Sequence, residues 1–237
     1  MKITQSTALV TGANRGLGRA FALRLLERGA DRVYATARRP ETVDLPGVEV
    51  LPLDITDPGA VRAVAEAAQD VDLLVNNAGI STMQDLVTGD PDLIRAELET
   101  HFFGTLAMTR AFAPILAHNG GGAIVNIMSA LSFRVFPGSG AYAAAKAAEW
   151  ALTNSTRIEL AGQQTQVVGV HLAATDTDMM AGWDIPKNRP DDVIRVVLDA
   201  LEAGDLEALV DEDTRSAKAL LSGPLEQMYP DLAARRG

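Results

Sequence analysis

The sequence contains no cysteine and only three histidines. Without cysteine the chain forms no disulfide and offers no thiolate to a metal, and His101, His118 and His171 lack the spacing of metal ligands. We therefore expect no metal site. No apolar run approaches the length that spans a bilayer, and residues 1–6 lead into a strand-like run without the apolar core of a signal peptide. These absences favour a cytoplasmic protein without membrane contact.

Basic residues are also scarce, with 21 Lys and Arg against 31 Asp and Glu, a formal net charge of −10. Such a chain repels nucleic acid and anionic surfaces unless its basic residues cluster, and they do not cluster strongly. No nucleic-acid partner is expected. A length of 237 residues is within the range of one α/β domain. Because we find neither an internal boundary nor a repeat, we predict a single domain over residues 1–237.

Short apolar runs alternate with helical patterns along the chain. Apolar runs without polar alternation are typical of parallel strands covered on both faces, and their alternation with helices indicates an α/β fold with a doubly wound parallel sheet. A long helix is expected over 90–117 and an irregular lid over 175–189. Strands are expected at 7–11, 32–37, 48–53, 73–75, 123–128, 167–172 and 208–210.

A glycine-rich turn follows the first expected strand. Residues Thr11 to Gly18 read Thr-Gly-Ala-Asn-Arg-Gly-Leu-Gly and open an amphipathic helix that stops near Gly29. Glycines let the backbone approach a diphosphate closely, and the helix N-terminus offers unpaired N–H groups and a partial positive charge. In the context of strand, turn and helix, this motif predicts nucleotide binding rather than a mere tight connection.

The second strand ends in Arg38 and Arg39 without an acidic residue. An NAD site usually places a carboxylate here, whereas arginine suits the 2′-phosphate of NADP. Arg38, helped by Arg15, is therefore expected to bind that phosphate, although two solvated arginines are the alternative. After the third strand, Asp54 is expected to accept from the adenine amino group or simply to cap a turn.

The residues with the clearest chemistry are Ser129, Tyr142 and Lys146. Positions four apart lie on one face of a helix, so the Tyr142 phenol and the Lys146 ammonium are neighbours. A nearby cation lowers the pKa of a phenol, which is ordinarily about 10. Ser129 comes beside the phenol if the loop 131–140 folds back. A solvated Tyr-Lys pair is the alternative, and the upstream motif argues against it.

Taken together, these motifs and Asn-Asn-Ala-Gly at Asn76 to Gly79 resemble the short-chain dehydrogenase/reductase family over essentially the whole chain. The resemblance implies a three-layer Rossmann-type fold and hydride transfer between a nicotinamide and a carbonyl or alcohol carbon. It also implies that Tyr142 is the general acid in reduction, that Ser129 orients the substrate oxygen and that Lys146 binds the nicotinamide ribose. The expected cofactor contacts are Gly12, Asn14, Arg15, Gly16, Leu17, Gly18, Arg38, Asp54, Ile55, Asn76, Ala78, Gly79, Tyr142, Lys146, Thr175 and Thr177.

Two departures from the family's pattern fall in functional segments. His101 replaces an asparagine that helps the family hold a water in a proton relay; a neutral imidazole can donate and accept, but it is bulkier and titrates near neutral pH. A buried structural role for His101 is the alternative. After the sixth strand, Ala173 and Ala174 replace the family's Pro-Gly, which leaves the path of that loop open, while Thr177 is retained.

The sequence thus predicts an NADPH-dependent reductase of a ketone or aldehyde, with NAD(H) the less favoured cofactor. Two alternatives are an imine reductase in which His101 alters proton transfer, and an NADP-binding regulator without turnover. The expected partners are a small-molecule carbonyl or imine substrate and further copies of the chain in a homodimer or homotetramer. The predicted walls of a hydrophobic substrate pocket are Met83, Phe133, Phe136, Met179 and Trp183.

Overall fold

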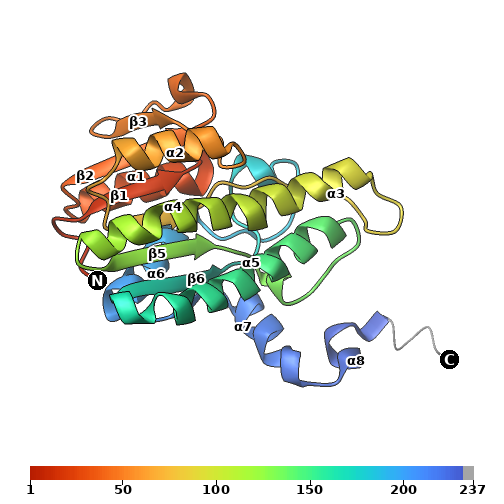
Figure 1. Cartoon of the computed structure of the whole chain (residues 1–237). Helices are drawn as coiled ribbons and strands as arrows, with labels where there is room; N and C mark the ends of the chain where they lie inside the picture. The colour runs from red at the N-terminus through yellow and green to blue at the C-terminus, as the bar shows by residue number, and fades with distance from the viewer. Residues whose placement is uncertain (232–237) are drawn as a thin grey trace.

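The computed structural model describes residues 1–231, and a parallel sheet of seven strands runs through it (Figure 1). The strand order is β3-β2-β1-β4-β5-β6-β7, and every neighbouring pair is parallel. The doubly wound parallel sheet expected from the sequence is therefore confirmed. The strands are β1 (Thr7–Thr11), β2 (Arg32–Ala37), β3 (Glu49–Pro52), β4 (Leu73–Asn76), β5 (Gly122–Ile127), β6 (Thr165–His171) and β7 (Glu207–Leu209).

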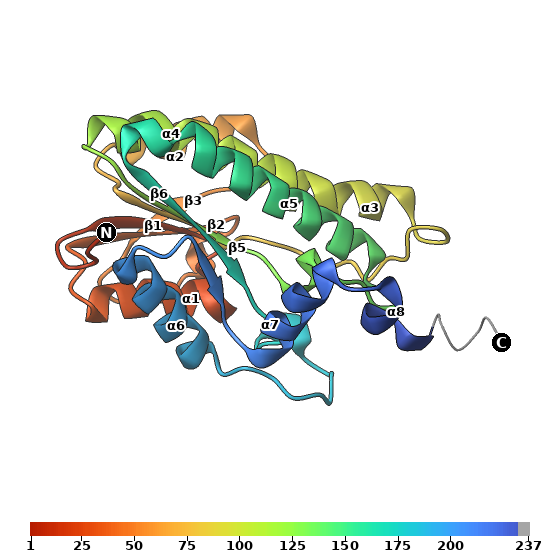
Figure 2. The same ribbon diagram turned by 90° about the horizontal axis from the view of Figure 1, so that it is seen from below.

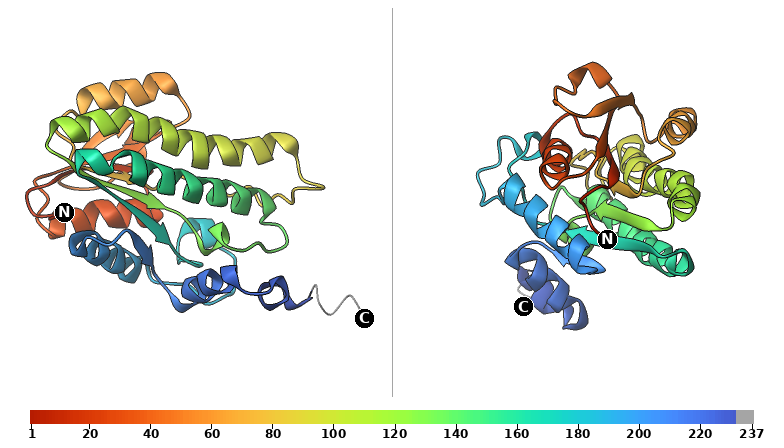
Figure 3. Two further views of the ribbon diagram at one scale, coloured as in Figure 1. Left: turned by 60° about the horizontal axis from the view of Figure 1, so that its bottom comes forward. Right: turned by 90° about the vertical axis from the view of Figure 1, so that its left-hand side faces the viewer.

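Helices cover both faces of this sheet (Figures 2 and 3). One face carries α1 (Gly16–Glu27) and α6 (Pro190–Ala203), and the other carries α2 (Pro58–Ala67), α4 (Thr105–His118) and α5 (Gly140–Glu159). Each layer has its own apolar core, with Phe21 of α1 and Phe112 of α4 completely buried. Burying one such side chain stabilises the fold by roughly 1.5–3 kcal/mol, which explains why both sheet faces are apolar.

The helix boundaries follow from local chemistry. Asp57 accepts a hydrogen bond from the Gly59 amide at 2.7 Å and so caps α2, in which Pro58 is the first residue. Asp90 caps α3 (Pro91–Leu98) in the same way through the Asp92 amide at 2.8 Å. A side-chain oxygen satisfies an otherwise unpaired helical N–H, and proline at the first position loses nothing there. The start of α3 agrees with the helix expected from residue 90.

The helix expected over 90–117 is present, but its middle is not a regular α-helix. Between α3 and α4 the backbone forms a π-helical segment, η2 (Glu99–Gly104). Gly104 lets this segment pack closely against the buried Ile55, because a Cβ on Gly104 would lie 2.7 Å from the Ile55 Cδ1. Single π-helical turns occur frequently at functional sites. The sequence pattern predicted the extent of the helix but does not reveal an extra residue in one turn.

The sheet's topology identifies where a ligand binds. Since all strands are parallel, their carboxyl ends lie at one edge, where Thr11, Asn76 and Ser129 follow or end β1, β4 and β5. The strand order changes direction between β1 and β4, and ligands of open α/β sheets bind outside the carboxyl ends at such a switch point. Within residues 1–231, no helix combines the length and the apolar character needed to cross a membrane.

Candidate active site

The glycine turn after β1 is held against the end of β4. The Thr11 hydroxyl accepts hydrogen bonds from the Asn77 and Ala78 amides at 2.9 and 3.0 Å. The Asn77 side chain donates to the Thr11 carbonyl at 2.9 Å. A Cβ on Gly18 would lie 2.2 Å from the Gly12 carbonyl oxygen, so no other residue fits this approach of helix to turn. The turn predicted from the sequence therefore has the tight geometry that its glycines indicated.

The N-terminus of α1 is open toward this edge of the sheet. Arg15 precedes the helix without a side-chain hydrogen bond to it, and Gly16 has a left-handed φ of +54°. A Cβ on Gly16 would lie 3.5 Å from the Thr177 Cγ2, so Thr177 lies against the turn, and its contact with a cofactor stays a prediction. Uncapped helical N–H groups and the helix dipole favour an anion. Asn14 and Leu17 are half-buried within the same turn.

The two polar residues expected to select the nucleotide have different surroundings. Arg38 is exposed immediately after β2, where a 2′-phosphate can reach it. Arg15 forms an ion pair with Asp178 at 3.3 Å, and both side chains are about two-thirds exposed. Asp54 caps a turn, because its Oδ1 accepts from the Thr56 amide and hydroxyl at 3.0 and 2.7 Å.

Several of the other expected cofactor contacts have structural partners. Ile55 is 7% exposed in the core, and the buried Asn76 side chain donates to Asn126 Oδ1 at 2.9 Å. Thr175 is buried and donates to the carbonyl of Ala173 at 3.2 Å. Their backbones still line the carboxyl edge, so a cofactor contact through main-chain atoms stays a prediction.

Ser129, Tyr142 and Lys146 come together as predicted. Ser129 follows the end of β5, and its hydroxyl accepts from the Leu131 amide at 3.1 Å. Tyr142 and Lys146 lie in the first turns of α5, with the ammonium 5.7 Å from the centre of the phenol ring. The Lys146 ammonium also donates to the Ile127 carbonyl at 2.7 Å, which fixes it beside the end of β5.

Two buried carboxylates that the sequence analysis missed complete this group. Glu149 Oε2 accepts from the Lys146 ammonium at 2.7 Å, and Glu97 Oε1 accepts from the Thr82 amide at 2.6 Å and the Thr82 hydroxyl at 2.9 Å. Both side chains are at most 2% exposed. The spacings Lys146–Glu149 and Glu97–His101 are ion-pair spacings on a helix, which was the available signal.

His101 lies between these carboxylates and the phenol. Its ring meets the Tyr142 ring edge-on, with centroids 5.2 Å apart, and its Nε2 lies 2.8 Å from the Ile80 carbonyl oxygen and 3.3 Å from Glu97 Oε2. A Cβ on Gly79 would lie 2.7 Å from His101 Cε1, so glycine is needed for the ring to reach this place. His101 is thus buried and hydrogen-bonded beside Tyr142, and its part in a proton relay stays a prediction.

The electrostatics of Tyr142 correct one expectation. Burial raises the pKa of Tyr142, and although the Lys146 cation lowers it, the nearby Glu149 and Glu97 raise it again, so that the net pKa is above the usual value. Burial would lower the pKa of Lys146, but the adjacent Glu149 carboxylate outweighs this and the net pKa is raised. The phenol is therefore protonated and the lysine charged near neutral pH.

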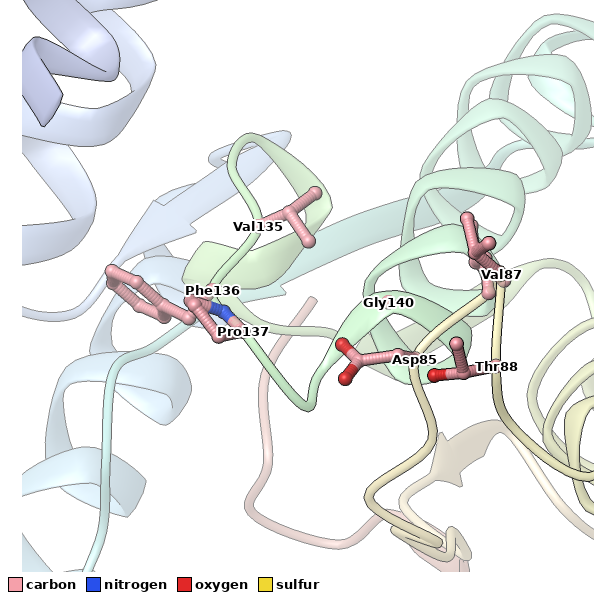
Figure 4. Close-up of a pocket in the computed structure, with 8 residues that line it drawn as sticks. Asp85, Val87, Thr88, Val135, Phe136, Pro137 and Gly140 are labelled. Carbon is pink, nitrogen blue, oxygen red and sulfur yellow. The ribbon is translucent and has the colours of Figure 1, made fainter. Parts of the chain in front are cut away.

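A cleft of about 480 Å³ opens beside the N-terminus of α5 (Figure 4). Of the predicted pocket walls, Phe136 lines it, and the exposed Met83 lies next to Gly138. Phe133 is instead buried, stacked on His171 at 4.3 Å. Met179 and Trp183 are partly exposed on the segment after β6. The lining residues are Asp85, Leu86, Val87, Thr88, Val135, Phe136, Pro137 and Gly140.

The loop after β6 is fixed without the Pro-Gly pair. The Asp211 carboxylate accepts from the Ala173 amide at 2.8 Å and from the Asn188 side chain at 2.7 Å, and Asn188 in turn donates its amide to Ala174 at 2.8 Å. Burial would raise the pKa of Asp211, but the hydrogen bonds from Ala173, Thr214 and Asn188 outweigh it, so the pKa is lowered. A single carboxylate thus sets the path that the sequence left open.

Comparisons with known proteins agree with this geometry. The model of the short chain dehydrogenase family matches residues 6–188. A short chain dehydrogenase from Burkholderia cenocepacia J2315, solved in complex with NADP, is 38% identical, with a TM-score of 0.93 over 98% of this chain and 99% of that one. The oxidoreductase calM of Penicillium decumbens is 35% identical over 60% of this chain and 51% of its own length.

The NADPH-dependent 1-acyldihydroxyacetone phosphate reductase of Schizosaccharomyces pombe is 33% identical over 73% of this chain and 61% of its own length. The chain therefore matches only a little more than half the length of these two relatives. The family model, by contrast, matches well over half of the chain. The protein accordingly belongs to the short-chain dehydrogenase/reductase family.

Proposed function

We propose that the protein is an NADPH-dependent reductase that converts the carbonyl group of a hydrophobic small molecule into an alcohol, with Tyr142 as the general acid. The observation that carries this proposal is a protonated phenol, beside Ser129 and Lys146, at the sheet edge that also holds the glycine turn. A phenol that keeps its proton near neutral pH can give it to a carbonyl oxygen that gains charge during reduction.

The residues at the switch point fit a dinucleotide. The glycine turn and the uncapped start of α1 suit a diphosphate, and the exposed Arg38 suits a 2′-phosphate. The relatives support this choice, since one was solved with NADP and another is named NADPH-dependent. We expect Arg38→Asp to weaken NADPH binding at least about tenfold while leaving NADH binding much less affected, because the lost contact is to the phosphate alone.

The chain's own residues then divide the work on the substrate. Bound NADPH supplies the hydride. The Ser129 hydroxyl accepts from Leu131, makes only a long contact of 3.5 Å to the Leu172 carbonyl and hydrogen-bonds Tyr142, so it lies beside the phenol and orients the substrate oxygen there. Tyr142 donates its proton to that oxygen. Lys146 uses two of its three N–H groups on Ile127 and Glu149, which leaves one for a ribose hydroxyl.

The cleft beside α5 supports an apolar substrate. Leu86, Val87, Val135 and Phe136 expose apolar surface to it, and Val87 is 96% exposed. The carboxylate in the cleft, Asp85, already accepts from the Gly138 amide at 2.7 Å. Each methylene removed from water contributes about 0.8 kcal/mol, so binding is expected to strengthen with the length of an alkyl substituent.

The test is NADPH oxidation with a series of ketones and aldehydes of increasing alkyl length. Tyr142→Phe is expected to lose at least about a hundredfold in kcat, because it removes the proton donor. Tyr34→Phe is the matched control. The Tyr34 hydroxyl bonds to Arg32 and Asp70, which lie at the amino ends of β2 and β4, at the opposite edge of the sheet from Tyr142. Unchanged turnover in Tyr142→Phe would remove Tyr142 from the mechanism.

The buried His101 favours imine reduction as a second candidate function. Its Nδ1 has no hydrogen-bond partner within the described chain, and the ring contacts Tyr142. An imidazole in this position can change proton transfer to the substrate. Cyclic imines in the same assay test this, and His101→Asn should then reduce imine turnover more than ketone turnover. Equal losses would argue against it. Tight NADPH binding with no turnover of any carbonyl, alcohol or imine would indicate a regulator instead.

A further inference from the structure

Glu149 is in direct contact with the catalytic lysine, yet the mechanism above gives it no task. Its carboxylate lies 2.7 Å from the Lys146 ammonium, and the exposed fractions of the two side chains are 2% and 5%. Two buried opposite charges at this distance interact strongly, because little water screens them. The electrostatic effect of the Lys146 ammonium on the neighbouring Tyr142 phenol therefore depends partly on Glu149.

The groups that face Tyr142 come from every element around it. Lys146 and Glu149 lie on α5, Glu97 on α3, His101 on η2, and the Ser129 hydroxyl at the end of β5. Two buried carboxylates thus surround a phenol that has one ammonium beside it. Only a charged His101 would make this group neutral, and a negative surplus opposes loss of a proton from a nearby phenol.

The position of His101 shows which groups contact the two buried carboxylates. Its Nε2 must carry a proton, because the Ile80 carbonyl oxygen at 2.8 Å can only accept. Its Nδ1 lacks a hydrogen-bond partner among residues 1–231 and lies 3.9 Å from Glu149 Oε2. The closest partner of the Glu149 carboxylate is therefore the Lys146 ammonium at 2.7 Å, followed by the Thr105 hydroxyl at 3.4 Å.

We propose that Glu149 is a positioning residue that acts on Tyr142 through Lys146. By binding the ammonium, it holds Lys146 at the Ile127 carbonyl and offsets the positive charge beside the phenol, which keeps the Tyr142 hydroxyl protonated. This inference rests on the proposed reductase function for its catalytic meaning. The consequence is a bias in direction: carbonyl reduction needs the protonated phenol that Glu149 maintains, whereas alcohol oxidation needs the phenolate that Glu149 opposes.

The titration of Tyr142 can be followed directly, because the chain has only three tyrosines. The near-ultraviolet absorbance of tyrosinate is recorded against pH for the full-length protein and for Glu149→Gln, each referred to the same protein carrying Tyr142→Phe. Glu149→Gln keeps an acceptor for Lys146 but removes the charge. Its Tyr142 midpoint is expected to fall by roughly one pH unit, as removal of a nearby like charge implies. The exposed Glu159→Gln on the same helix should not move it.

A midpoint that stays unchanged or rises in Glu149→Gln would overturn the proposal. If Glu149→Gln does not fold, Glu149→Asp retains the charge but withdraws it from Lys146, and the same fall, though smaller, is expected. With a working substrate, the alkaline limb of the pH profile for reduction should shift down in step with the absorbance. A purely structural Glu149 would lower kcat at every pH without moving that limb. The absorbance titration needs no turnover, so absence of reductase activity would leave this test intact.

Discussion

The most quantitative prediction from this structure is how much unfolding free energy the protein loses at acid pH through His171. The side chain is completely buried next to Ser129: its Nδ1 lies 3.2 Å from the Ser129 carbonyl oxygen, and its ring stacks on Phe133 at 4.3 Å. Burial lowers the pKa of His171 from 6.5 to about 4; the Ser129 hydrogen bond opposes this, and the surrounding cations, Lys218 first, add to it. The perturbation is His171→Gln, which removes the titrating group and retains a donor.

The direction and size follow from proton linkage. The folded pKa is depressed, so the unfolded chain binds the proton first as pH falls. The stability contribution of neutral His171 is present above about pH 6.5 and is lost progressively as pH falls toward about 4. Between pH 7 and pH 5 this loss amounts to about 2 kcal/mol for the native protein, and His171→Gln should not show it.

The assay is urea unfolding at several pH values, followed by the fluorescence of the two tryptophans, one of which, Trp150, packs edge-on against His171. His171→Gln is expected to be less stable than the native protein at pH 7, because it loses the stacking on Phe133, and to lose about 2 kcal/mol less on acidification. His118→Gln is the control, since His118 is exposed at the end of α4. Equal acid losses in the native protein and His171→Gln would refute the reasoning.

Three further predictions follow. Gly18→Ala should weaken NADPH binding at least about tenfold in a fluorescence titration, because its Cβ would lie 2.2 Å from the Gly12 carbonyl oxygen; an unchanged Kd would contradict the tight turn. Burial raises the pKa of Asp72 to about 6, so its stabilising contribution is present below about pH 4 and is lost as pH rises through 6. Asp72→Asn, which keeps an acceptor for the Thr7 amide, should therefore gain about 1 kcal/mol of unfolding free energy at pH 7 but not at pH 4, and a loss at pH 7 would contradict this. Asp211→Asn should cost about 2 kcal/mol, since its new NH₂ group opposes donors, and stability equal to the native protein would argue against its role in fixing the loop.

The parts of the site predicted from the sequence are those that local chemistry specifies. The glycine turn, the start of the helix at residue 90 and the Tyr142–Lys146 pair each depend on a few neighbouring residues, and all are present. The order of strands and helices followed from apolar periodicity, with strand ends displaced by one or two residues. Oligomeric state and cellular location stay predictions, because neither leaves a local pattern in one chain.

The parts that were missed depend on burial, which a single sequence does not reveal. Charged residues on a helix usually face solvent, so nothing in the sequence singled out Glu97 and Glu149, although both are buried beside Tyr142. For the same reason an aromatic residue in a loop, Phe133, was assigned to the pocket although it lies in the core. The expected lowering of the Tyr142 pKa was wrong in direction, because burial of the phenol, and after it the two buried carboxylates, raise the pKa by more than Lys146 lowers it.

The π-helical segment η2 has a consequence for how tolerant this region is to change in length. Each residue of a regular helix turns the chain by about 100°, and a π turn contains one residue more. The segment η2 therefore sets the rotation of α3 about its axis relative to α4. Removing one residue from 99–104 is expected to leave α4 packed on the sheet but to rotate α3 about its axis. This rotation would carry the Glu97 carboxylate away from Tyr142. The expected result of this deletion is a folded protein that has lost its proposed activity. Deletions in surface loops, by contrast, are usually tolerated.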